Sequence, residues 1–164
     1  MKVVGVRLEM PSNTPIVLLQ EESGEGRMLP ILIGQAEATA IALALEEVET
    51  PRPMTHDLVR DLFMVLGTTL DKVVVTDLRD KTFFAELHLS GGAGEQIVSS
   101  RPSDAIAIAV RTESPVFAEP HVLDAAGFLP DPDDDDDDDD GDAEEVLDEF
   151  REFIDNVNPE DFGG

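Results

Sequence analysis

Residues 101–111 read Arg-Pro-Ser-Asp-Ala-Ile-Ala-Ile-Ala-Val-Arg, and this stretch predicts the third helix of the fold. Ile106 and Val110 are four positions apart, which places them on one face of a helix. Ser103 is a favourable N-cap residue, so we expect the helix to begin there and to continue to Arg111. An arginine, a hydroxyl and an acid therefore gather where this helix begins.

The remaining elements follow from residue periodicity and turn signals. Strands are predicted around the alternating Val4, Val6 and Leu8, and over residues 15–20, 28–33, 70–76, 82–89, 95–99 and 115–118. Helices are predicted over residues 35–48, 55–66 and 120–126. The strands occur in runs and do not alternate strictly with helices. This order predicts an α+β fold with a single domain over residues 1–129 and a largely antiparallel sheet.

A second polar helix start lies at residues 51–58, Pro-Arg-Pro-Met-Thr-His-Asp-Leu. Thr55 is a favourable N-cap, Asp57 falls in the first turn, and Gly67 is expected to terminate the helix after Leu66. The backbone N–H groups of a first helical turn lack intrahelical partners and attract anions. Neighbouring acids are suited to hold a divalent cation.

These residue types suit metal-assisted hydrolysis of a phosphodiester. Such a reaction needs carboxylates or histidine to hold a divalent ion, and an arginine to balance charge on the phosphate. The candidates are His56, Asp57 and Asp104 as catalytic residues, Arg52, Thr55, Arg101 and Ser103 as substrate-binding residues, and Glu37, Asp57 and Asp104 as ligands of Mg²⁺ or Mn²⁺. For activity, these side chains have to converge in space.

Each candidate also has a purely structural interpretation. Asp57 and Asp104 would each stabilise a helix N-terminus by roughly 0.3–1 kcal/mol. The two arginines would pair with these acids internally, His56 would bond a backbone carbonyl, and Glu37 would be a solvated helix residue.

The chain resembles the bifunctional nuclease family, a group of prokaryotic and plant domains that cut both DNA and RNA. The resemblance rests on the two polar helix starts together with Leu29–Gly34, Glu37-Ala38 and Ala40-Ile41. It extends from about Met1 to Ala118. The resemblance implies nuclease activity with DNA or RNA as substrate.

Net charge restricts how a polyanion would be held. Residues 1–129 contain 10 Lys and Arg against 19 Asp and Glu, a net charge of −9, whereas residues 130–164 contain 1 against 18, a net charge of −17. Because nucleic acids bind mainly by exchanging counterions for Lys and Arg, we expect weak, salt-sensitive binding. The absence of cysteine excludes disulfides and thiolate catalysis, and no apolar stretch is long enough to span a bilayer. A cytoplasmic protein is the expectation.

The C-terminal segment has a different composition. Residues 130–142, with eight consecutive aspartates at 133–140, predict a disordered linker. Within residues 143–164, apolar residues at helical spacing predict an amphipathic helix over 143–157. Its apolar face would contact the domain, a second copy in a homo-oligomer such as a dimer, or a protein partner. The alternative function is accordingly a non-enzymatic regulatory or scaffold module that recruits a partner through this tail.

Deleting residues 130–164 is expected to leave the thermal unfolding midpoint of the domain nearly unchanged, because an acidic linker contributes no core. Differential scanning calorimetry of the full chain and the truncated chain measures this. A large loss of stability would instead show that the terminal segment docks on the domain.

Overall fold

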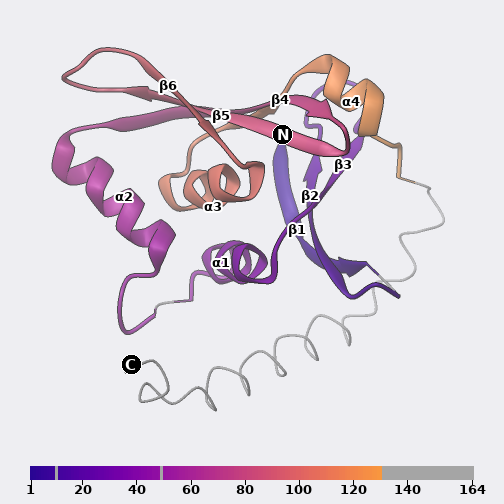
Figure 1. Cartoon of the computed structure of the whole chain (residues 1–164), viewed down its shortest axis with the longest axis horizontal. Coiled ribbons are helices and arrows are strands. Elements are labelled where there is room, and N and C mark those ends of the chain that lie inside the picture. The colour runs from indigo at the N-terminus through magenta and orange to yellow at the C-terminus, as the bar shows by residue number, and fades with distance from the viewer. Residues whose placement is uncertain (10, 49, 131–164) are drawn as a thin grey trace. The chain divides into compact units, whose positions relative to one another are not determined.

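The computed structural model describes residues 1–9, 11–48 and 50–130, which form two β-sheets and four α-helices (Figure 1). The elements are, in chain order, β1 (Lys2–Glu9), β2 (Thr14–Gln20), β3 (Met28–Leu32), α1 (Gln35–Leu45), α2 (Thr55–Leu66), β4 (Thr69–Arg79), β5 (Thr82–Ser90), β6 (Gln96–Ser100), α3 (Pro102–Thr112), β7 (Val116–Ala118) and α4 (Pro120–Ala126). The predicted α+β class is confirmed.

The sheet differs from the prediction in being split into two. The first sheet is antiparallel in the order β1-β2-β3, and its central strand supplies the fully buried Val17 and Leu19. The second sheet has the order β6-β5-β4-β7, in which β7 runs parallel to β4. Asp80 and Lys81 close the β4–β5 hairpin, and both have the positive φ that a two-residue type I′ turn requires.

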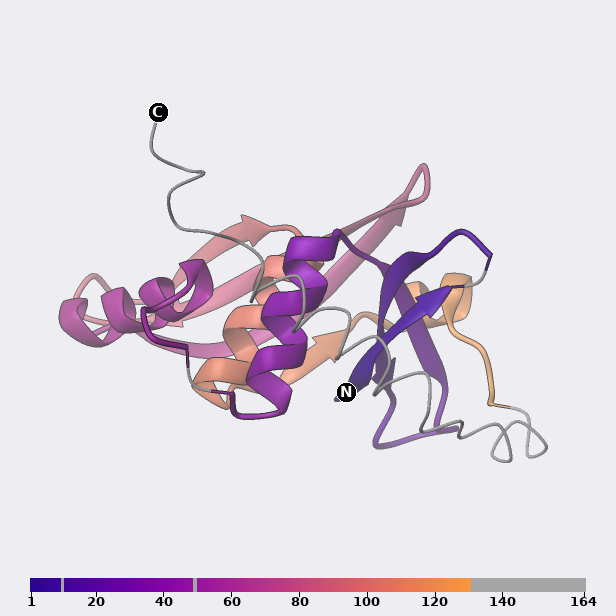
Figure 2. The same ribbon diagram turned by 90° about the horizontal axis from the view of Figure 1, so that it is seen from below.

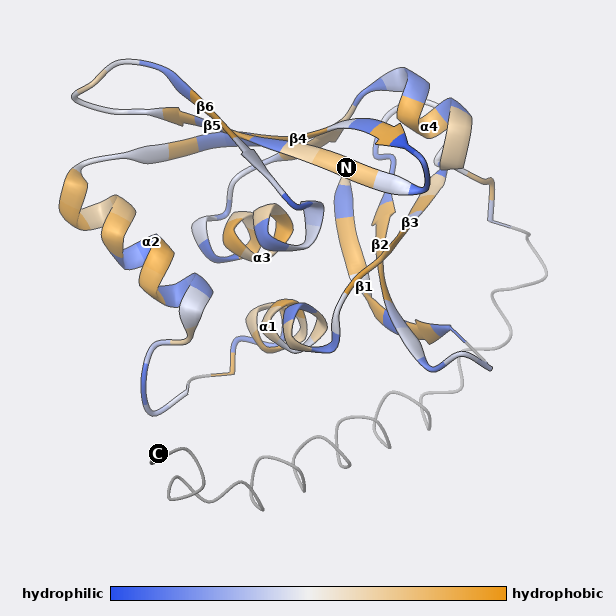
Figure 3. Ribbon diagram, viewed as in Figure 1, coloured by the Kyte–Doolittle hydropathy of each residue, from blue (hydrophilic) through white to orange (hydrophobic). Residues whose placement is uncertain are grey.

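The helix α3 occupies the centre of the domain. It packs against β4 and β5 on one side and against α1 and α2 on others, as the two views agree (Figures 1 and 2). Seven of its eleven residues are buried, among them all five from Ala105 to Ala109. Figure 3 shows apolar residues over most of this helix. A helix that is apolar on most sides is typical of a core position, and its alanines allow close approach of the neighbouring elements.

Local capping sets the helix ends, and three of them differ from the prediction. The helix α1 ends at Leu45 because Glu47 adopts a left-handed conformation with φ 55°. The N–H of Val48 then donates to the carbonyl of Leu43, which closes the helix in a Schellman motif before the prolines are reached.

The two helix starts that carry the polar residues are capped one or two positions earlier than predicted. Met54, and not Thr55, is the N-cap of α2, while Arg101, and not Ser103, is the N-cap of α3. Pro102 occupies the first turn of α3, where its lack of an N–H has no cost. Gly67 does terminate α2, with φ 62°.

The linker predicted over residues 130–142 lies outside the described residues except for Pro130, and the helix predicted over residues 143–157 lies outside them entirely. Within the described part of the chain, none of the helices has the length and apolar character needed to cross a bilayer.

Candidate functional site

Two polar clusters flank α3. Four residues, Glu37 from α1, His56 from α2, and Arg101 and Asp104 from the start of α3, form what we call the Arg101 cluster. The second cluster lies nearer the other end of α3, where Arg111 forms an ion pair with Asp57 of α2. The adjacent residues His56 and Asp57 of α2 therefore belong to two different clusters.

Arg101 bridges two carboxylates. Its Nε donates to Oδ2 of Asp104 at 2.7 Å, and its Nη2 contacts both Oδ1 of Asp104 at 3.1 Å and Oε1 of Glu37 at 2.7 Å. The Arg101 side chain is nevertheless 66% exposed, whereas that of Glu37 is 16% exposed. One solvent-facing guanidinium therefore neutralises two acids that are themselves largely covered.

His56 is held by the same acid. Its Nε2 lies 3.2 Å from Oδ1 of Asp104, and its side chain is only 12% exposed. A carboxylate accepts hydrogen bonds, so this contact favours the tautomer with hydrogen on Nε2. The predicted structural role of His56, a bond to a backbone carbonyl, is replaced by a bond to Asp104.

The position of Glu37 depends on a glycine. Gly34 is the N-cap of α1, and the Glu37 carboxylate folds back so closely over it that a Cβ at position 34 would collide with Oε2. A larger residue at position 34 would therefore displace Glu37 from its ion pair with Arg101. The loop between β3 and α1 therefore helps to position Glu37 in the Arg101 cluster.

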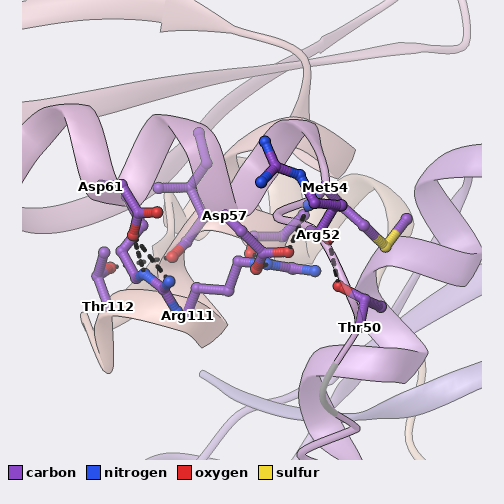
Figure 4. A network of polar contacts seen from close by, with 10 residues as sticks. Thr50, Arg52, Met54, Asp57, Asp61, Arg111 and Thr112 are labelled. Atoms are coloured by element: carbon purple, nitrogen blue, oxygen red, sulfur yellow. Dashed lines mark hydrogen bonds and ion pairs between the residues drawn. The ribbon is translucent and has the colours of Figure 1, made fainter.

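The second cluster is a buried ion pair. Oδ1 of Asp57 accepts from Nε of Arg111 at 2.6 Å, and its Oδ2 accepts from the N–H of Met54 at 2.9 Å (Figure 4). Nη1 of Arg111 donates in turn to the carbonyl of Ala107 at 2.9 Å. The Arg111 side chain is 5% exposed, so the pair ties the start of α2 to α3 away from solvent.

Both acids stay ionised in these surroundings. Burial alone would raise the pKa of Asp104, but the hydrogen bonds from Arg101 and His56 outweigh it and hold that pKa below its usual value. In the same way, burial of Asp57 is outweighed by the hydrogen bonds from Arg111 and Met54, so the pKa of Asp57 is also lowered. The pKa of Arg101 is raised by its bonds to Asp104 and Glu37.

Three predicted substrate-binding residues lie outside both clusters. Arg52 and Thr55 are exposed, and the carbonyl of Arg52 accepts a hydrogen bond from the Thr50 hydroxyl. Ser103 is only 6% exposed, which leaves little of it for a substrate to reach. Sequence reasoning missed Arg111. The sequence did contain a signal for it: Arg111 is seven residues after Asp104, so both lie on one face of α3 and could have been expected to face the same neighbouring helix.

The predicted metal ligands do not converge on one point. Asp57 faces Arg111, while Glu37 and Asp104 both face Arg101. Across residues 1–9, 11–48 and 50–130, no three His, Asp or Glu side chains are arranged to hold a metal ion. Glu37 and Asp104 nevertheless lie close together, since both contact Nη2 of Arg101. Proteins commonly bind Mg²⁺ through one or two carboxylates, with substrate phosphates as further ligands, and these two carboxylates fit that pattern.

A model of the bifunctional nuclease domain matches residues 17–131, a span that includes both clusters. The chain belongs to the bifunctional nuclease domain family. It is also 46% identical over 161 residues to an uncharacterized protein of Mycobacterium tuberculosis, an alignment that covers 98% of this chain and 96% of that protein.

Two plant proteins share the domain within much longer chains. Bifunctional nucleases 1 and 2 of Arabidopsis thaliana are 34% and 35% identical to this chain over 105 and 112 residues. These alignments cover 62% and 65% of this chain but only 32% and 34% of the plant proteins. The chain thus corresponds to about one third of each plant nuclease.

The Asp57–Arg111 pair is expected to be a major stabilising contact of the helix layer. Asp57→Asn leaves a buried guanidinium without its anion, so we expect the free energy of unfolding at pH 7 to fall by about 3 kcal/mol. Because the pKa of Asp57 is lowered by folding, its contribution is present above the unfolded pKa, roughly 3.9, and is lost as the pH falls through the folded pKa. Urea unfolding at pH 7 and at decreasing pH measures both effects.

The matched control is Asp61→Asn on the same helix. Asp61 also pairs with an arginine, Arg60 at 2.8 Å, but the side chains of Arg60 and Asp61 are 39% and 35% exposed. Such a surface pair contributes about 0.5 kcal/mol. Equal losses of stability in the two variants would contradict the structural role assigned to Asp57.

Proposed function

We propose that this chain is a nuclease that hydrolyses phosphodiester bonds of DNA and RNA, with its centre at the Arg101 cluster. One observation supports the proposal most directly: the Asp104 carboxylate is hydrogen-bonded to both the imidazole of His56 and the solvent-facing guanidinium of Arg101. This combines a proton-transfer group with a phosphate-binding group in a member of the bifunctional nuclease domain family. Family membership supports the nucleic-acid substrate.

Arg101 is proposed to bind the phosphate. A guanidinium donates to phosphate oxygens in a fork, and Arg101 is the most exposed member of its cluster. Arg52 is exposed and lies shortly before α2, where it would contact the nucleic-acid backbone as a second positive charge. Because few arginines hold the polyanion, binding is weak and salt-sensitive.

His56 is proposed to transfer the proton. With Nε2–H bonded to Asp104, the basic nitrogen is Nδ1, which makes no hydrogen bond within the described residues. In the reaction Nδ1 accepts a proton from the water as the water oxygen bonds to phosphorus. The bond from phosphorus to the leaving oxygen breaks, that oxygen takes up a proton from solvent, and His56 Nδ1 returns its own proton to solvent to restore the neutral imidazole. Asp104 stabilises the imidazolium that forms.

A divalent ion, Mg²⁺ or Mn²⁺, is part of the proposal. Glu37 and Asp104 would hold it once a phosphate draws Arg101 away from them, and Asp57 is left out of the ligand set because it pairs with Arg111. When bound, such an ion would activate water and offset phosphate charge. We further propose a cytoplasmic location and a homo-oligomer, of which a dimer is the simplest form.

The alternative, a non-enzymatic regulatory or scaffold module that recruits a protein partner, is favoured by one observation. Each of the acids Glu37, Asp57 and Asp104 is paired with an arginine of the same chain. Such pairing is what a purely structural cluster would also show. A cleavage assay with matched variants separates the two functions.

His56→Ala and Asp104→Asn are each expected to lower turnover by about 10²–10⁴-fold, the range that general acid–base groups contribute. The assay follows cleavage of fluorescently labelled single-stranded DNA and RNA, with each variant purified alongside the wild type. Asp61→Asn, which removes a half-exposed carboxylate of α2 that lies outside both clusters, should cleave like the wild type. Arg52→Ala and Arg101→Ala should chiefly raise KM. Equal cleavage by folded wild type and Asp104→Asn would overturn the assigned site.

Chelation tests the metal separately. Cleavage should cease in excess EDTA and return when Mg²⁺ or Mn²⁺ is added in excess over the chelator. Glu37→Gln should raise the Mg²⁺ concentration needed for half-maximal rate, because it removes one of the two carboxylates. Full activity in EDTA would exclude the metal while leaving the roles of His56 and Asp104 in place.

A further inference from the structure

The helix α2 exposes an apolar stripe that nothing in the described part of the chain covers. Four aliphatic residues form this α2 stripe: Leu58 at 53%, Leu62 at 47%, Val65 at 83% and Leu66 at 71% exposure. None of the twelve residues of α2 is fully buried, although Val59 and Phe63 on its other side pack against the core. Figure 3 shows the same helix as largely hydrophobic.

We propose that the α2 stripe is the interface between two copies of this chain, with the two α2 helices packed antiparallel about a two-fold axis near Leu62. The stripe amounts to several hundred Å² of apolar surface, which is about the largest patch that a monomer leaves in water. A stable interface takes roughly 800 Å² from each partner. The α2 stripe supplies part of that area, and side chains that neighbour it in the interface supply the rest.

The spacing of the stripe suits pairing with itself. Leu58 and Leu66 lie four residues on either side of Leu62. In an antiparallel pair, Leu62 of each copy therefore faces Leu62 of the other, and each Leu58 faces a Leu66. A two-fold interface requires this property, because the same surface must be its own complement. Positions 58, 62 and 65 also follow the spacing of four and three residues by which paired helices interlock.

Charge on α2 itself permits a second copy to bind there. The chain carries a net charge of −26, so most of its surface would repel an identical molecule. On α2, however, Asp57 is paired with Arg111 and Asp61 with Arg60. Two copies can therefore meet at the stripe without unpaired acids facing each other. The acidic segment 143–157 would find no unengaged arginine on this helix.

The pairing would place the partner subunit near the start of α2. In an antiparallel pair, the end of one α2 lies beside the beginning of the other, and His56 is in the first turn of α2. Leu66 of the partner subunit would then lie near the start of the helix that carries His56. This inference is independent of catalysis, since it concerns assembly alone.

Mass measurement on the full chain tests the proposal. Light scattering at about 50 μM should give twice the 17.8 kDa of one chain. Leu62→Glu places two carboxylates at the axis and should yield a monomer with unchanged far-ultraviolet circular dichroism. The control Ile97→Glu adds the same charge on β6, where Ile97 is 62% exposed and paired with His88, on the sheet face away from the core residue Leu87; it should remain a dimer.

Cross-linking gives an independent measurement, because the chain contains no cysteine. Under mild oxidation Leu62→Cys should form a disulfide-linked dimer, whereas Ile97→Cys should stay largely monomeric on a non-reducing gel. This variant keeps the proposal testable if Leu62→Glu fails to fold. A monomeric wild type at 100 μM, a Leu62→Glu variant that remains dimeric, or loss of the dimer in Phe150→Glu but not in Leu62→Glu would each overturn the proposal.

Discussion

The burial of α3 is the constraint on which the rest of the domain depends. Because β4, β5, α1 and α2 all pack against this helix, the stretch Ala105–Ala109 is excluded from water and has to be apolar. Polar side chains fit only towards its ends, where Asp104 and Arg111 lie on one face. Each then requires a partner of opposite charge, since an unpaired buried charge is costly. Arg101 meets this requirement for Asp104, and Asp57 of α2 meets it for Arg111.

Local features of the fold were accessible from the sequence, whereas most of its helix caps and the pairing of its strands were not. Alternation identified β1, and the β-branched runs around Asp80-Lys81 identified the β4–β5 hairpin. The end of α1 was missed because it depends on a non-glycine residue, Glu47, in a left-handed conformation. The division into two sheets also escaped prediction, because strand periodicity reports which face is buried and not which strands pair.

The polar residues of the two helix starts were recognised from the sequence, and so was an internal pairing of Arg101 with an acid, but the partners of His56 and Asp57 were not. The sequence placed His56, Asp57, Arg101 and Asp104 at two helix starts, and the structure does bring those starts together across α2 and α3. Adjacent helix residues point about 100° apart, so His56 and Asp57 reach different partners. The sequence alone could not show which partners these are. Arg111 escaped notice because its pairing with Asp57 is a tertiary contact 54 residues distant.

Exposure distinguishes the two arginines that face the acids of α2 and α3. Arg111 is almost completely buried and bonds both a carboxylate and a backbone carbonyl, so its removal from Asp57 would leave two charges in a dry environment. Arg101 is two thirds exposed, and ion pairs of such solvated groups contribute about 0–1 kcal/mol. A phosphate in solution can therefore compete for Arg101 but not for Arg111. The Arg111 pair accordingly fixes the helices, while the Arg101 cluster is the one whose contacts can be exchanged for those of a ligand.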